Sequence, residues 1–91
     1  MSLSAEIEDL GARNALALLC EVSRHYQPDT HPNTQQLKRI ISRHDKECAA
    51  SAGSYMLQAK PEVKDWYAYL FSVAKNRMQE KRQLQEILEA L

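Results

Sequence analysis

The segment PEVKDWYAYLFSVAKNRMQEKRQLQEILEAL, residues 61–91, decides the fold of this chain. After Pro61 the segment contains neither proline nor glycine, so nothing in its interior stops a helix. Proline suits the first turn of a helix, because the backbone hydrogen that it lacks would have no partner there. The pattern therefore predicts one helix over residues 61–91, about 46 Å long.

The apolar surface of this predicted helix is unusually wide. On a helical wheel it covers an arc of about 200°, whereas an amphipathic helix needs little more than about 100°. Its densest part is the run Trp66-Tyr67-Ala68-Tyr69-Leu70-Phe71, and Leu84, Ile87, Leu88 and Leu91 continue it. Either this is the central helix of a small bundle, packed on two sides, or part of the arc binds a partner protein. Tyr69 and Ile87 lie at one margin of the arc, so we expect them to be exposed.

Two cations, Arg77 and Lys81, fall in the middle of the apolar arc. An uncompensated buried charge costs several kcal/mol, so each cation needs a partner or water. We expect Arg77 to pair with Glu21 or Asp45, and Lys81 to reach water along its aliphatic stem. Alternatively the bundle opens at this level, and the two cations meet an acidic partner or a nucleic acid.

Two further helices are predicted before this one. Apolar residues recur at helical spacing over residues 4–26, where Ser4 is a suitable N-cap. A proline-containing break follows, and Asn33, with Gln36 three residues later, can cap a second helix over residues 34–59.

The small residues Ala49–Ser54 in the second helix are open to two interpretations. They permit a neighbouring helix to approach closely, which we favour; alternatively a kink or loop near Gly53 divides the helix in two. We therefore predict a single all-α domain, a three-helix up-down-up bundle over residues 1–91. Four helices, through a break near Ala49–Ser54, are the alternative.

Composition excludes several classes of function. Lys and Arg together number 12, as do Asp and Glu, so no long-range field draws the chain to nucleic acids or anionic membranes. No apolar stretch approaches the roughly 20 residues of a membrane span, no signal peptide is recognisable, and the two cysteines favour a reducing compartment. We expect a cytoplasmic protein that contacts no membrane. No glycine-rich loop, strand or carboxylate cluster is present, so we predict no enzyme, no catalytic residue and no cofactor.

A metal site is a weaker alternative for the histidines and cysteines. His44 and Cys48 are four residues apart on one predicted helix, Cys20 lies at about the same level, and His25 or His31 could be a fourth ligand. The pattern matches no standard zinc spacing, and His44 and Cys48 also fit the core stripe of their helix. We predict packed core residues and no metal; a Cys20–Cys48 disulfide is a further alternative.

The sequence thus favours a small intracellular protein-interaction module of the adaptor, co-chaperone, inhibitor or immunity type. Its partner would be another protein, including a second copy in a homodimer. The candidate partner-binding residues share the last helix: Trp66, Tyr67, Tyr69, Phe71, Arg77, Lys81 and Ile87. The alternative function is a nucleic-acid-binding regulator with a basic helix face. That face would consist of Lys38, Arg39, Arg43 and Lys46, or of Lys75, Arg77, Lys81 and Arg82, although acidic neighbours dilute both sets.

Overall fold

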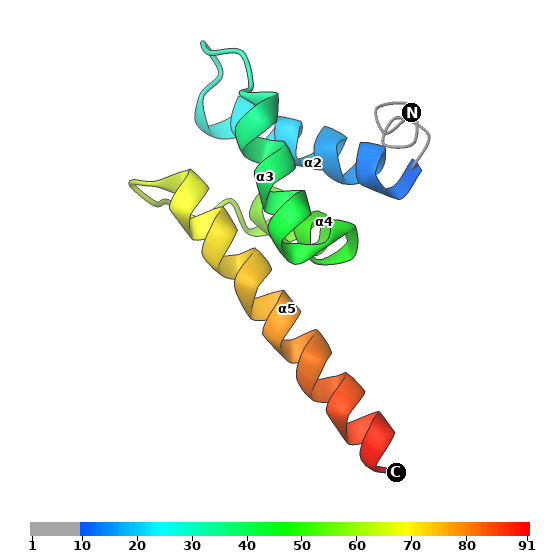
Figure 1. Ribbon diagram of the computed structural model, residues 1–91. Helices are drawn as coiled ribbons and strands as arrows, with labels where there is room; N and C mark the ends of the chain where they lie inside the picture. Colours follow the sequence, from blue (N-terminus) through cyan, green and yellow to red (C-terminus); the bar gives the residue numbers. More distant parts are fainter. Residues whose placement is uncertain (1–9) are drawn as a thin grey trace.

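The computed structural model describes residues 10–91, which form four α-helices and no strand. The helices are α2 (Leu10–Tyr26), α3 (Thr34–His44), α4 (Lys46–Ala59) and α5 (Trp66–Ala90), shown in Figure 1. The all-α prediction is confirmed. Within the described residues the helix count is that of the four-helix alternative, so the three-helix arrangement is wrong. The prediction for residues 4–9, including Ser4 as N-cap, lies outside the described residues.

The division of the predicted second helix lies at Asp45, not at Ala49–Ser54. Asp45 has φ 84° and ψ 163°, a backbone conformation that favours glycine. Its N–H donates to the carbonyl of Ile41 at 2.9 Å and so closes α3. Its carboxylate accepts a hydrogen bond from the Cys48 N–H at 2.8 Å and so caps α4. One residue therefore ends one helix and begins the next.

The small residues of α4 allow α2 to pack closely against it, as the favoured interpretation predicts. Ala49, Ala52 and Gly53 are buried. A Cβ atom added to Gly53 would lie 3.2 Å from Cδ2 of Leu19 and 3.5 Å from Cβ of Leu18. The space between the two helices therefore accommodates only very small side chains here.

The last helix begins at Trp66, five residues later than the predicted start at Pro61. Lys60, with φ 46°, ends α4 in the left-handed conformation, and its N–H donates to the carbonyl of Met56 at 2.9 Å. Asp65 caps α5 by accepting a hydrogen bond from the Ala68 N–H at 3.0 Å. An N-cap side chain determines the start, because proline tolerates a first helical position but supplies no acceptor side chain.

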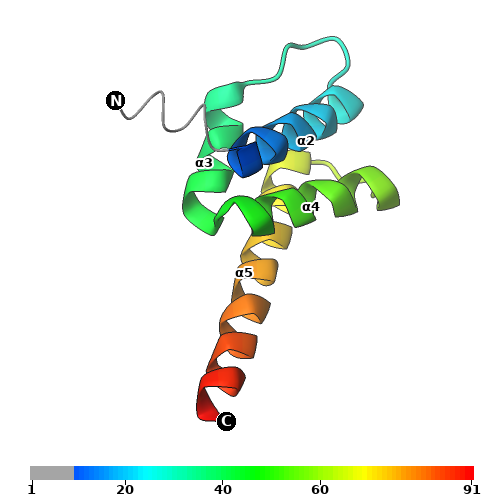
Figure 2. The ribbon, with the colours of Figure 1, turned by 90° about the vertical axis from the view of Figure 1, so that its right-hand side faces the viewer.

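The core lies between α2, α3, α4 and the N-terminal half of α5. Its largest fully buried side chains come from all four helices: Leu19, Val22, Leu37, Ile40, Met56 and Leu70. In α5 the buried residues are Leu70 and Ala74 alone. Figure 2 shows α5 crossing α4 steeply and extending well beyond the other three helices. None of the helices in residues 10–91 is both long and apolar enough to cross a membrane.

Candidate partner-binding surface

The aromatic run at the start of α5 packs against its own fold. The Trp66 ring stacks on Tyr26 of α2, with centroids 6.0 Å apart and planes 6° from parallel. Phe71 meets His44 of α3 edge-on, with centroids 4.5 Å apart. Trp66 and Phe71 are half-buried, and both contact the core cluster. These two predicted binding residues therefore join α5 to α2 and α3.

The two tyrosines of the same run are also used internally. The Tyr67 hydroxyl donates to the carbonyl of Gln36 in α3 at 3.0 Å. The hydroxyls of Tyr69 and Tyr55 lie 3.5 Å apart, and this hydrogen bond raises the pKa of Tyr69 above its ordinary value. Tyr69, which we expected to be exposed, is half-buried.

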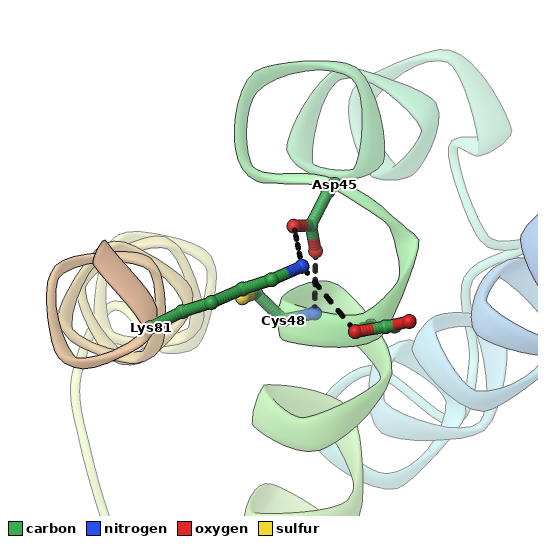
Figure 3. Close-up of polar contacts among 4 residues, drawn as sticks. Asp45, Cys48 and Lys81 are labelled. Atoms are coloured by element: carbon green, nitrogen blue, oxygen red, sulfur yellow. Dashed lines mark hydrogen bonds and ion pairs between the residues drawn. The ribbon is translucent and has the colours of Figure 1, made fainter. Parts of the chain in front are cut away.

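Lys81 is partly exposed, and its ammonium also binds carboxylates at the N-terminus of α4. Its ammonium lies 2.9 Å from Oδ2 of Asp45 and 3.3 Å from Oε2 of Glu47 (Figure 3). Hydrogen bonds to these two carboxylates raise the pKa of Lys81. Burial by itself would raise the pKa of Asp45, but the hydrogen bonds from the Cys48 backbone and from Lys81 together lower it. The ion pairs hold the middle of α5 against the α3–α4 junction.

Arg77 has neither of its predicted partners. Its guanidinium lies 3.7 Å from Oε2 of Glu80, one turn away on the same helix. The bend at residue 45 brings Asp45 to the level of Lys81, and this pairing replaces the one predicted for Arg77. The Nε atom of Arg77 is buried and has no hydrogen-bond partner within the described part of the chain.

We considered His44, Cys48 and Cys20 as metal ligands, and each has a different environment in the fold. His44 is buried, with Nδ1 3.0 Å from the carbonyl of Ile40. Cys48 is buried, and this burial, followed by its contact with Asp45, raises the pKa of the thiol. Cys20 and Cys48 are both free thiols, so the disulfide alternative is wrong. Among residues 10–91 no group of three or more His, Cys, Asp or Glu side chains could hold a metal ion.

The two basic faces differ in how open they are. Lys38, Arg39 and Arg43 are all exposed on α3. On α5, Lys81 is paired with two carboxylates and Arg77 lies near Glu80, so much of the positive charge there is compensated. The basic face of α5 is therefore a poorer surface for polyanions than the sequence indicates.

An open hollow lies along α2. Its lining comes from this one helix: Asn14, Ala17, Leu18, Cys20, Glu21 and Arg24. Arg24 and Glu21 pair at 2.7 Å within it. A small-molecule site is usually lined by side chains from several helices or strands, whereas the lining of this hollow comes from α2 alone.

The second half of α5 presents apolar side chains to solvent. Residues 82–91 are all exposed. Among them Leu84 is 58% exposed, Ile87 59%, Leu88 61% and Leu91 97%. We call these four residues the α5 apolar face. Only Ile87 was among the predicted binding residues.

The α5 apolar face continues a stripe that begins in the core. Seven positions on one side of the helix follow at alternating spacings of four and three residues: Leu70, Ala74, Arg77, Lys81, Leu84, Leu88 and Leu91. The first two are buried, the middle two are cations with carboxylate neighbours, and the last three are exposed. This regular spacing beyond Lys81 is the signal in the sequence that could have identified the site.

Comparison with known proteins assigns no role to this surface. The surface features from which a function can be proposed are therefore the α5 apolar face, the ion pairs of Lys81 beside it and the exposed cations of α3. No protein-family model matches the chain, and neither a curated protein nor a solved structure matches it.

Proposed function

We propose that the chain is a protein-interaction module that binds its partner through the α5 apolar face. The observation that carries the proposal is the exposure of Leu84, Ile87, Leu88 and Leu91 on adjacent helical turns. Single exposed apolar side chains are common on protein surfaces, but contiguous ones mark interaction sites. The spacing i, i+3, i+4 and i+7 is also the one by which an amphipathic helix docks on a partner.

The free energy available from this face is consistent with specific binding. Full burial of a leucine or isoleucine side chain contributes about 1.5–3 kcal/mol. Because Leu84, Ile87 and Leu88 are each about three-fifths exposed, a covering partner would gain about 1–2 kcal/mol from each. Leu91, which is almost fully exposed, would contribute more.

The remaining predicted binding residues have a supporting role in this proposal. Trp66, Tyr67, Tyr69 and Phe71 attach the first half of α5 to the other helices. Lys81 adds solvent-accessible ion pairs to Asp45 and Glu47 at the point where α5 leaves them. The apolar face is thereby presented on the part of α5 that extends beyond these contacts.

Site-specific photo-crosslinking in the host that encodes the chain tests this proposal. A benzophenone amino acid at position 88 should form an adduct with a partner protein. The same amino acid at position 86, which is also exposed but lies on the opposite side of the helix, is the matched control and should form little. Equal adduct formation at the two positions, or none at either, would refute the proposal.

Nucleic-acid binding through α3 is the second candidate, and the exposure of Lys38, Arg39 and Arg43 favours it. If each of these three side chains neutralised a phosphate group, the affinity would fall steeply with rising salt concentration. A gel shift at low salt, compared with a variant in which the three cations are replaced by glutamine, tests it. Absence of a complex with the unmodified chain removes this candidate.

A further inference from the structure

We infer that α3 is a recognition helix for duplex DNA, which lies in the major groove with Lys38 and Arg43 on the phosphates and Arg39 on the bases. The inference goes beyond the α5 apolar face and rests on the second candidate function, because it names the class of nucleic acid and the role of each cation. Three features carry it: the charge of the outer face of α3, the order of side chains around the helix and the position of α3 in the fold.

The outer face of α3 carries positive charge that no carboxylate neutralises within the described part of the chain. Lys38, Arg39 and Arg43 are exposed, and none of them forms an ion pair with a described Asp or Glu. The helix itself contains no acidic residue. The carboxylate of Asp45, which follows it, is already bound by Lys81. The face is therefore complementary to a polyanion, although the chain as a whole has no net charge.

The side chains follow one another around α3 in an order that suits a groove between two phosphate backbones. On a helical wheel, Lys38 and Arg43 lie at the two margins of the exposed arc, about 140° apart. Arg39 lies between them and shares the centre of the arc with exposed Gln35 and Ser42. The three buried residues of α3 lie on the opposite side of the helix. In a major groove, the margins of such a helix meet phosphates and its centre meets base edges.

The dimensions and composition of this face favour duplex DNA over duplex RNA or a single strand. The major groove of B-form DNA is about 12 Å wide and admits a helix, whose diameter with side chains is about 10–12 Å. The 11 residues of α3 give about 16 Å of helix, so its whole outer face can enter the groove. The major groove of duplex RNA is too narrow for side chains to read. Proteins that bind single strands stack the bases on aromatic rings, and α3 contains no Phe, Tyr or Trp.

The position of α3 leaves its outer face open to a duplex. The buried ring of His44 contacts Phe71 of α5 edge-on, and the Tyr67 hydroxyl donates to the carbonyl of Gln36. These contacts attach α3 to α5. In Figure 2, α3 lies on the left and α2 and α4 extend to its right, so these two helices approach α3 from one side. The side that carries the three cations is exposed to solvent.

The two kinds of contact have different consequences for binding. Lys38 and Arg43 supply affinity without sequence preference, because every phosphate is alike. Two neutralised phosphates make the affinity fall about twelvefold between about 50 mM and about 200 mM salt. Arg39 supplies sequence preference, since a guanidinium binds O6 and N7 of guanine together, and the amide of Gln35 can bind adenine in the same way.

Fluorescence anisotropy of the full chain with a labelled DNA duplex of mixed sequence, about 20 bp long, tests the phosphate contacts. The double variant Lys38→Gln, Arg43→Gln should bind more weakly and lose most of the salt dependence. The matched control Lys75→Gln, Arg82→Gln removes the same charge from exposed positions on α5 and should bind as the unmodified chain does. Circular dichroism checks that both variants keep their helix content. Equal weakening in the two variants, or weakening in the α5 variant alone, would overturn the role of α3.

Selection from a pool of random DNA duplexes tests the role of Arg39. The unmodified chain should enrich duplexes with guanine at one position, by about tenfold or more. Arg39→Gln should lose that enrichment and keep the salt dependence. The absence of any enrichment, or the same enrichment with Arg39→Gln, would overturn base contact by this residue.

The choice of nucleic acid separates this inference from the candidate function on which it rests. Duplex RNA and single-stranded DNA of the same length should bind about tenfold more weakly than duplex DNA. If either binds as tightly, nucleic-acid binding stands and the major-groove arrangement is overturned. If none of the three binds, both fail, whereas the role of the α5 apolar face is decided separately by the crosslinker at position 88.

Discussion

Replacing Asp45 by alanine and by glycine tests where the segment 34–59 divides. At this residue the backbone has φ 84° and ψ 163°, the carboxylate caps α4 through the Cys48 N–H, and a second oxygen binds Lys81. A helix that continued through residue 45 would have none of these features. The order of stability of the alanine and glycine variants is therefore opposite for a divided helix and for a continuous one.

The magnitudes follow from the contacts of Asp45. Loss of its N-cap hydrogen bond to Cys48 costs about 1 kcal/mol. The ion pair with Lys81 is solvent-accessible and adds little. Holding a residue other than glycine in this conformation costs about 1–3 kcal/mol. Glycine relieves that strain but loses about 0.5–1 kcal/mol of additional backbone entropy on folding.

We therefore expect Asp45→Gly to be more stable than Asp45→Ala by about 1 kcal/mol, the middle of the range of about 0–2.5 kcal/mol that these two contributions give. In a continuous helix the order is the reverse, because alanine exceeds glycine by about 1 kcal/mol. The sign of the difference, more than its size, distinguishes the two structures.

Thermal unfolding followed by circular dichroism at 222 nm measures the difference. A change of about 1 kcal/mol corresponds to about 4–8 °C in Tm for a domain of this size. Ser51, which is exposed in the interior of α4, is the control, and there alanine should be more stable than glycine. If alanine were also the more stable residue at position 45, the division at Asp45 would be refuted.

Three further predictions concern acid, thiol reactivity and helix packing. The pKa of Asp45 is lower in the folded chain than its ordinary value of 3.8. The carboxylate therefore contributes its full stabilisation at a pH above 3.8, and that stabilisation is lost as the pH falls through the pKa of the folded state. Between about pH 5 and pH 2 the free energy of unfolding of Asp45→Asn should thus vary less than that of the unmodified chain; equal slopes in urea titrations would contradict this. A thiol reagent should modify partly exposed Cys20 in the folded protein and Cys48 only after unfolding, because Cys48 is buried and its pKa is raised. Fast reaction of two thiols would contradict that burial. Gly53→Leu should destabilise the fold by about 2 kcal/mol in thermal unfolding, because even a Cβ atom at this position would lie 3.2 Å from Leu19. An unchanged Tm would mean that α2 and α4 are farther apart than in this structure.

Local signals predicted much of the secondary structure. Asn33 caps α3 by accepting a hydrogen bond from the Gln36 N–H at 3.3 Å, as the sequence predicts. The division at Asp45 was missed because buried residues on both sides of it, such as Ile40 and Cys48, face the same core and so keep a helical spacing across the junction. Periodicity reports which side of a segment is covered, and it does not report that the backbone turns between two covered positions.

The pairing of cations was beyond the reach of the sequence for a related reason. Arg77 and Lys81 occupy equivalent places in the apolar arc, and each could reach a carboxylate on another helix. The bend at Asp45 decides which of them does, because it sets the height of the α4 N-terminus against α5. Lys81 therefore binds Asp45 and Glu47, while Arg77 lies near Glu80 of its own helix.

By itself the sequence determined that the chain is helical and that the last helix has an apolar stripe longer than a small core needs, because propensity and periodicity are local properties. Only the tertiary structure decided which part of that stripe is covered. The helix α4 crosses α5 steeply (Figure 2), so α2, α3 and α4 bury only Leu70 and Ala74 in its first half. The same pattern beyond Lys81 therefore remains in solvent, and it is the direction in which the neighbouring helices cross α5 that turns a core stripe into a candidate binding face.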